Sequence, residues 1–206
     1  MIKAIRATVF ASMLLMGSYA SADVVFFDIF PESNPPNDCA GYYSNPNNFS
    51  SCIIYAEDLG QGDGNVSSVI AKYDVEEDEW EVSTFWPDFD ETLINLNGTV
   101  EEDAHGSWSY AGDEILFWVV KSATGFRVFY FADDDTCVDG IASAGSFGCM
   151  SSALHSHSGD WWTISEQGIS HITFYNGEVV AEPGTLALLG LGLLGMGLRR
   201  RRKVIA

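Results

Sequence analysis

The middle of this sequence has almost no positive charge. Of the ten lysine and arginine residues in the 206-residue chain, only Lys72, Lys121 and Arg127 lie between Asp23 and Glu182, whereas all 29 acidic residues lie in that range. Three basic against 29 acidic residues give this part a formal charge of −26. Such a surface repels the phosphates of DNA, RNA and anionic lipid headgroups, so nucleic acid is excluded as a partner.

The same range also lacks any long stretch with the 3.6-residue periodicity of an amphipathic helix. It contains short runs rich in β-branched and aromatic residues, separated by clusters of Gly, Pro, Asn, Asp and Ser. We therefore expect an all-β fold, an antiparallel β-sandwich or a jelly-roll-like domain. The predicted strands are Val24–Phe30, Cys52–Ala56, Val66–Tyr73, Glu79–Trp86, Leu93–Val100, Ser107–Tyr110, Ile115–Lys121, Phe126–Phe131, Trp161–Ile164 and Ile169–Tyr175.

Two connections between these strands read as tight turns. Asp74–Asp78 is expected at the acidic tip of a hairpin, and Ser122–Gly125 is expected to join the two most apolar runs. Two other connections, Pro31–Ser51 and Ala132–Asp160, read as long loops. Loops of this length are uncommon unless they are functional or cross-linked.

Both long loops contain cysteines. No two cysteines of the chain are spaced as a C-x-x-C motif. The four cysteines are Cys39, Cys52, Cys137 and Cys149. In an oxidising compartment, an even number of cysteines predicts two disulfides, for which three connectivities exist. The short separations favour the local pairs Cys39–Cys52 and Cys137–Cys149, each contributing roughly 3 kcal/mol in the chain-entropy model. A zinc site is the alternative.

Motifs of the common hydrolase classes are missing. No G-x-S-x-G or H-E-x-x-H occurs, and the acidic residues are too numerous to single out a glycosidase pair. We expect no catalytic residues, no enzymatic activity and no defined metal site. Calcium is an alternative as a cofactor, because Asp133–Asp135 offers oxygen ligands. An EF-hand count started at Asp135 fails, with Cys137 at the third position and Ser146 at the twelfth.

Aromatic residues offer a different kind of site. Trp161 and Trp162, together with Trp80 and Trp86, are candidates for a face that stacks on sugar rings. Adjacent residues of a strand point to opposite faces, so one of Trp161 and Trp162 is expected in the core and the other at the surface. A core position for these tryptophans is the alternative. His171 is expected on the exposed face or the edge of its strand.

The N-terminus reads as a secretory signal peptide over residues 1–22. Lys3 and Arg6 precede an apolar run, and the run ends at the A-x-A site formed by Ala20 and Ala22. Cleavage after Ala22 would leave Asp23 as the new N-terminus, with an ectodomain over residues 23–177.

The remaining residues, 178–206, form a tail of a different composition. Thr185–Leu198 is an apolar stretch of 14 residues, expected to be a short helix, and Arg199–Lys203 is a basic cluster. Such a helix would rise about 21 Å, short of the roughly 30 Å hydrocarbon core of a bilayer. The basic cluster would stay cytoplasmic and leave the acidic domain outside. These properties favour a transient signal over a permanent anchor.

This tail resembles the PEP-CTERM sorting signal in its motif, apolar length, basic run and terminal position. Ala181 stands where the family motif has its first proline. The residues that match the signal are Glu182, Pro183, Gly184, Thr185, Arg199, Arg200, Arg201 and Arg202. The resemblance implies export through the Sec machinery of a Gram-negative bacterium, a precursor tethered at the inner membrane, and recognition by an exosortase.

The resemblance also implies a place at the cell surface or in the extracellular matrix. Family members are commonly associated with exopolysaccharide and biofilm matrix. We therefore expect a non-enzymatic exported protein that contacts polysaccharide. A secreted hydrolase acting on glycan and an acidic calcium-stabilised module are the alternatives.

Overall fold

The computed structural model describes residues 22–30, 38–39, 42–43, 49–84, 86–133, 137 and 144–178. Its regular secondary structure is almost entirely antiparallel strand, which confirms the expected all-β class. The strands are β1 (Asp23–Ile29), β2 (Ile53–Tyr55), β3 (Asn65–Asp74), β4 (Glu79–Val82), β5 (Ile94–Asn97), β6 (His105–Tyr110), β7 (Phe117–Ser122), β8 (Phe126–Ala132), β9 (Ser158–Trp162) and β10 (Ile169–Glu178). The helical elements are short: η1 (Phe49–Ser51), η2 (Glu91–Leu93), α2 (Phe147–Met150) and η4 (Ile164–Glu166).

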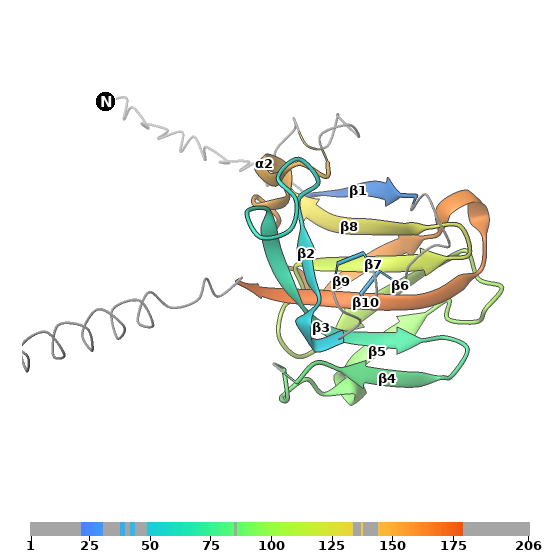
Figure 1. The fold of residues 1–206 in the computed structure, drawn as a ribbon. Coiled ribbons are helices and arrows are strands. Elements are labelled where there is room, and N and C mark those ends of the chain that lie inside the picture. Colours follow the sequence, from blue (N-terminus) through green and yellow to red (C-terminus); the bar gives the residue numbers. More distant parts are fainter. Residues whose placement is uncertain are drawn as a thin grey trace, which may run out of the picture.

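The strands form two sheets. The larger sheet has the order β1-β8-β7-β10-β3-β2, with β4 pairing to β3, and the smaller has the order β5-β6-β9. Figure 1 shows β1, β8, β7 and β10 crossing the molecule as successive strands. Strands β7 and β8 are buried along almost their whole length. Such continuous burial requires cover on both faces of the larger sheet.

The smaller sheet covers one of these faces. Trp108 on β6 packs against Trp118 on β7 and Phe174 on β10, with ring centroids 5.3 Å and 5.4 Å apart. Trp118 is stacked in turn on Phe129 of β8. Each fully buried aromatic side chain stabilises the fold by roughly 1.5–3 kcal/mol, so this aromatic layer holds the two sheets together.

The opposite face is covered by the segments that contain the disulfides. Both predicted pairs are present, Cys39–Cys52 and Cys137–Cys149, and no cysteine is free. All four half-cystines belong to one hydrophobic cluster. The same cluster contains buried residues of the central strands, including Phe117 and Tyr130. The disulfides therefore lie inside a second core.

The expected turns are confirmed, and the second long loop is corrected. β3 pairs with β4 around the acidic tip, and β7 pairs with β8 across Ser122–Gly125. The predicted loop Ala132–Asp160 is wrong at its end, because β9 begins at Ser158 and pairs with β6. β10 runs to Glu178, one residue past the expected end of the ectodomain.

Candidate functional site

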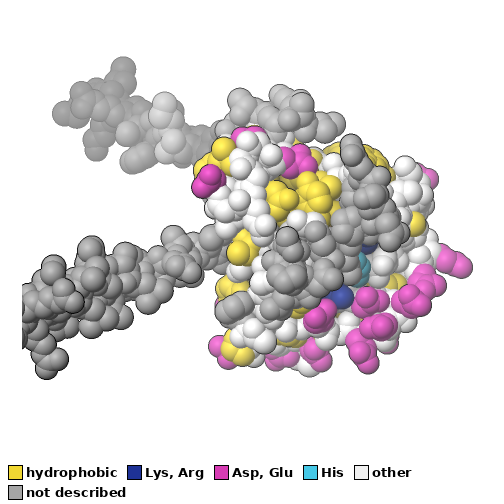
Figure 2. Space-filling view, in the orientation of Figure 1, with side chains coloured by type: hydrophobic (Ala, Val, Ile, Leu, Met, Phe, Trp, Pro, Cys, Tyr) yellow, Lys and Arg dark blue, Asp and Glu magenta, His cyan; other side chains and the backbone are white. Residues whose placement is uncertain are grey.

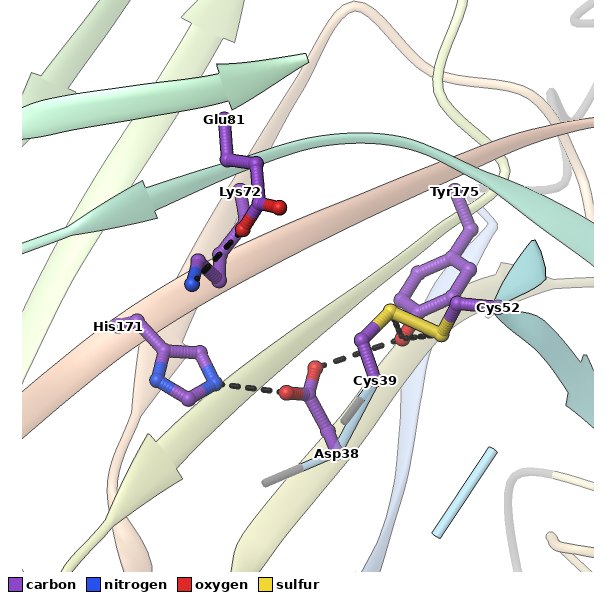
Figure 3. Close-up of a disulfide and its surroundings, with 7 residues drawn as sticks. All are labelled: Asp38, Cys39, Cys52, Lys72, Glu81, His171 and Tyr175. Carbon is purple, nitrogen blue, oxygen red and sulfur yellow. Dashed lines mark hydrogen bonds and ion pairs between the residues drawn. A yellow bond between two sulfur atoms is a disulfide. The ribbon is translucent and has the colours of Figure 1, made fainter. Parts of the chain in front are cut away.

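A buried polar cluster lies beside the Cys39–Cys52 disulfide. Nε2 of His171 on β10 is 2.7 Å from Oδ1 of Asp38, and the hydroxyl of Tyr175 donates to the other Asp38 oxygen at 3.4 Å. Figure 3 shows the side chains of His171 and Tyr175 pointing toward Asp38 from two sides. The Tyr175 oxygen also lies 3.4 Å from both sulfurs of the disulfide.

The electrostatics of this cluster follow from burial and pairing. Burial alone would raise the pKa of Asp38, but the charge and hydrogen bond of His171, together with hydrogen bonds from Thr173 and the Cys39 backbone, hold the pKa below the ordinary value of 3.8. Burial raises the pKa of Tyr175 well above 10, so its hydroxyl stays protonated. Burial lowers the pKa of Lys121, and the Asp38 carboxylate opposes that shift.

His171 was predicted at the surface, and that prediction is wrong. The residue is 2% exposed because β10 lies between β3 and β7, with both faces of the sheet covered. Asp38 is 0% exposed. The contacts of this buried cluster link the disulfide-containing segment to the central strand β10.

The lysine and arginine residues between Asp23 and Glu182 also bind groups within the domain. Nζ of Lys72 lies 3.2 Å from a Glu81 oxygen, the pair drawn in Figure 3, and Lys121 donates to the carbonyl of Ser122. Arg127 makes two hydrogen bonds to the Asp28 carboxylate, at 2.5 Å and 2.7 Å.

These contacts leave the surface negative. Lys121 and Arg127 are each 8% exposed, and the Lys72 side chain is 15% exposed. In Figure 2, acidic side chains gather along one border of the visible face, while few Lys or Arg side chains reach it. The described domain therefore presents carboxylates to its partners with almost no cations beside them.

One surface feature suited to hold a ligand is a pocket of about 220 Å³ where the β4–β5 connection meets the end of β6. We call it the aromatic pocket. Its lining combines three aromatic rings with two carboxylates: Ile70, Trp86, Pro87, Asp88, Phe89, Tyr110 and Asp113. Mostly apolar walls with a few polar groups are the usual composition of small-molecule sites.

Consecutive turns shape the wall of the aromatic pocket. The amide of Trp86 donates to the carbonyl of Ser83, and the amide of Phe89 donates to the carbonyl of Trp86. Pro87 occupies the second position of the latter turn, where its fixed φ is favourable. The Asp90 side chain then caps η2 by accepting from the amide of Thr92. This series of turns fixes the backbone that carries Trp86, Asp88 and Phe89.

The floor of the aromatic pocket is fixed by packing. Tyr110 is 5% exposed, and its ring centroid lies 5.2 Å from that of Phe89. A Cβ atom added at Gly112 would lie 2.4 Å from the Tyr110 ring, so glycine is needed there for close packing. Burial raises the pKa of Tyr110, and the nearby carboxylates of Asp113 and Asp90 add to the shift. The Tyr110 hydroxyl is therefore neutral at physiological pH.

A second depression, of about 360 Å³, lies between the smaller sheet and strands β1 and β8. We call it the serine groove. Its lining is Val24, Asn97, Ser107, Trp108, Ser109, Phe131, Ser158, Gly159 and Asp160. It has only one carboxylate, and its one tryptophan is 2% exposed, so it lacks an accessible indole face.

The two tryptophans predicted as glycan contacts have different surroundings. Trp161 is 1% exposed, so the alternative of a core tryptophan holds for that residue. Trp162 is partly buried, with its ring edge-on to Phe26 and Phe129 and with the Arg127 guanidinium 5.7 Å from its centroid. Much of its surface is already in contact with protein, and a sugar contact there stays a prediction.

Sequence reasoning named Trp86 but missed the residues that complete the aromatic pocket. The sequence Trp86-Pro87-Asp88-Phe89 is a turn signal that could have placed two aromatic rings side by side. Tyr110 and Asp113 come from a different connection, and no local signal links them to that turn.

Several predicted sites are not represented among the described residues. No group of three or more metal-binding side chains occurs among those residues, and Asp133 is the one member of Asp133–Asp135 that they include. Ala22 directly precedes β1, whereas Ala20 lies outside the described residues. The expected apolar helix 185–198 and the sorting residues from Glu182 to Arg202 also lie outside them. Within the described ranges, no helix is long and apolar enough to span a membrane.

Comparison with known families identifies the tail. A family model of the PEP-CTERM protein-sorting motif matches residues 179–202, which directly follow β10. No curated protein matches the chain, and no solved structure does. The match confirms the resemblance seen in Glu182–Thr185 and the arginine run. The chain therefore carries a PEP-CTERM protein-sorting motif, which implies an exported protein that an exosortase processes.

Proposed function

We propose that this protein is a non-enzymatic component of the cell surface or extracellular matrix that associates with exopolysaccharide through the aromatic pocket. Its precursor is tethered at the inner membrane of a Gram-negative bacterium after Sec-dependent export. Exosortase processing then removes the basic tail and releases the acidic domain to the exterior.

The observation that carries the proposal is the composition of the aromatic pocket. Trp86 and Phe89, which are only partly buried, provide flat apolar surfaces against which the C–H faces of a sugar ring can pack. Asp88 and Asp113 provide hydrogen-bond acceptors for hydroxyl groups, and the Tyr110 hydroxyl provides a neutral donor. This combination suits a polar ring with apolar faces better than a purely apolar ligand.

A secreted glycan-acting hydrolase is the competing function. A hydrolase needs a proton donor and a second carboxylate on opposite sides of the scissile bond. Both carboxylates that line the aromatic pocket are exposed, whereas the proton donor of a glycosidase is typically a carboxyl group in an apolar, buried environment. This environment favours binding over hydrolysis.

The test is a pull-down of the mature exported protein with exopolysaccharide from the producing cells. Binding should persist during incubation without release of reducing ends, and Trp86→Ala should weaken it. The matched control is Phe147→Ala, which removes an aromatic ring of helix α2 that is 37% exposed and is not part of the lining of the aromatic pocket. Released reducing ends would establish the hydrolase, and equal binding by both variants would exclude the aromatic pocket as the contact.

A further inference from the structure

We infer that the aromatic pocket selects a sugar ring carrying a protonated amine, as in a de-N-acetylated hexosamine unit. This inference rests on the proposed function, which supplies polysaccharide as the ligand class. It adds the charge of the sugar and the residues that recognise that charge.

The first support is the pairing of aromatic rings with carboxylates. An ammonium group is attracted to the face of Trp or Tyr and to a carboxylate, and both kinds of group line this pocket. Trp86 and Phe89 are each only partly buried, so ring surface remains accessible. Asp88 and Asp113 are exposed, and no ion pair to either occurs among the described residues. Their charge is therefore available to an incoming amine.

The second support is that no basic side chain of the protein competes for the aromatic pocket. Lys72 pairs with Glu81 and Asp74, and Arg127 pairs with Asp28. Lys121 donates to a backbone carbonyl beside the buried cluster. The sequence has no other lysine or arginine between Asp23 and Glu182, so no lysine or arginine of the ectodomain neutralises the carboxylates of the aromatic pocket.

The third support is the charge of the domain as a whole. Uronic acid, sulfated and pyruvylated polymers are anionic, and a domain of formal charge −26 repels them. The same field attracts a polymer of amino sugars. General attraction of this kind acts at every acidic surface, so the aromatic pocket has to be tested with short ligands and charge-matched variants.

The size of the aromatic pocket sets the length of the recognised unit. Its 220 Å³ is below the roughly 300–1,000 Å³ of sites for drug-sized ligands. It therefore suits a single ring, with neighbouring units of the polymer lying outside on the surface.

The experiment is calorimetric titration of the mature exported protein with a glucosamine trimer at physiological salt. The expected result is binding that Trp86→Ala weakens by about tenfold. The double variant Asp88→Asn/Asp113→Asn should weaken it by a similar factor. Glu76→Gln/Glu77→Gln removes the same charge at the exposed β3–β4 tip and should change the affinity by less than about twofold at this ionic strength.

Three further ligands separate this inference from the proposed function. An N-acetylglucosamine trimer that binds as tightly as the glucosamine trimer would overturn the role of the amine while leaving polysaccharide binding intact. If choline binds as tightly as the glucosamine trimer, recognition of the sugar ring is contradicted and the aromatic pocket is a simple cation site. Failure of both trimers and of the native exopolysaccharide to bind would overturn the proposed function as well. Equal loss in the Glu76/Glu77 control would show that net charge, rather than the aromatic pocket, governs binding.

Discussion

The Nε2 atom of His171 lies 2.7 Å from a carboxylate oxygen of Asp38, and both side chains are almost completely buried. The two residues are 133 positions apart in the sequence. Their contact joins the disulfide-containing segment to β10, a central strand of the larger sheet. Cys39 follows Asp38 directly. The Cys39–Cys52 disulfide and the Asp38–His171 contact therefore fix two adjacent residues of the chain.

Removing the histidine should destabilise the fold strongly. His171→Ala leaves the Asp38 carboxylate buried without its main partner, which costs roughly 3 kcal/mol or more. The control is His157→Ala, because the His157 side chain is 57% exposed and lies 3.6 Å from a Glu114 oxygen. That change should stay within about 0.5 kcal/mol. Denaturant unfolding measures both, and similar losses in the two variants would contradict the role of the buried pair.

The Asp38–His171 pair is expected to contribute to the loss of stability in acid. The pKa of Asp38 is lower in the folded state than its ordinary value of 3.8, so the unfolded chain binds more protons as the pH falls through that value. The stabilisation is therefore complete above about pH 4 and is lost as the pH falls toward the lower folded value. Thermal midpoints measured between pH 6 and pH 2.5 should fall less steeply in Asp38→Asn than in the wild type. Parallel curves would show that Asp38 does not contribute.

The two disulfides should differ in their effect on stability. Replacing either pair by serine should cost roughly 2–5 kcal/mol, since each closes a loop of similar length. The loss should be larger for Cys39→Ser/Cys52→Ser, because these sulfurs contact Tyr175 beside the Asp38–His171 pair. Chemical denaturation of the two double variants provides the comparison. A greater loss for Cys137→Ser/Cys149→Ser would contradict this ranking.

Glycine is required where the smaller sheet packs on the larger one. A Cβ atom at Gly159 would lie 2.7 Å from the Trp118 ring and 2.8 Å from Nε1 of Trp108. Gly159→Ala should therefore cost about 1–3 kcal/mol through overpacking. Gly148→Ala is the matched control, because its Cβ would have no neighbour closer than 4.0 Å and helix α2 tolerates alanine. A shift in thermal midpoint for the control but not for Gly159→Ala would contradict the close packing.

The sequence predicted the strands well because their signals are local. Each β-branched or aromatic run lies between turn residues, and every predicted run overlaps an observed strand. The short spacing of the cysteines likewise favoured the pairs that the structure contains. The hairpins at Asp74–Asp78 and Ser122–Gly125 also followed from neighbouring residues alone.

The sites were harder to predict because they join distant segments. His171 alternates with apolar residues as an exposed strand residue would, and its burial against Asp38 depends on a segment 133 residues away in the sequence. The aromatic pocket similarly requires the turn at Trp86 and the end of β6 to meet. Strand periodicity identifies the two faces of a strand, but it does not tell which faces another layer will cover.

Processing of the tail is the central claim, and intact mass tests it most directly. The mature protein should be isolated from cells with and without the exosortase and measured by mass spectrometry. The account predicts that the protein from exosortase-containing cells has lost the basic cluster Arg199–Lys203, whereas the protein from cells without the enzyme still carries it. Identical masses from both cells, each including Leu186–Ala206, would contradict exosortase sorting.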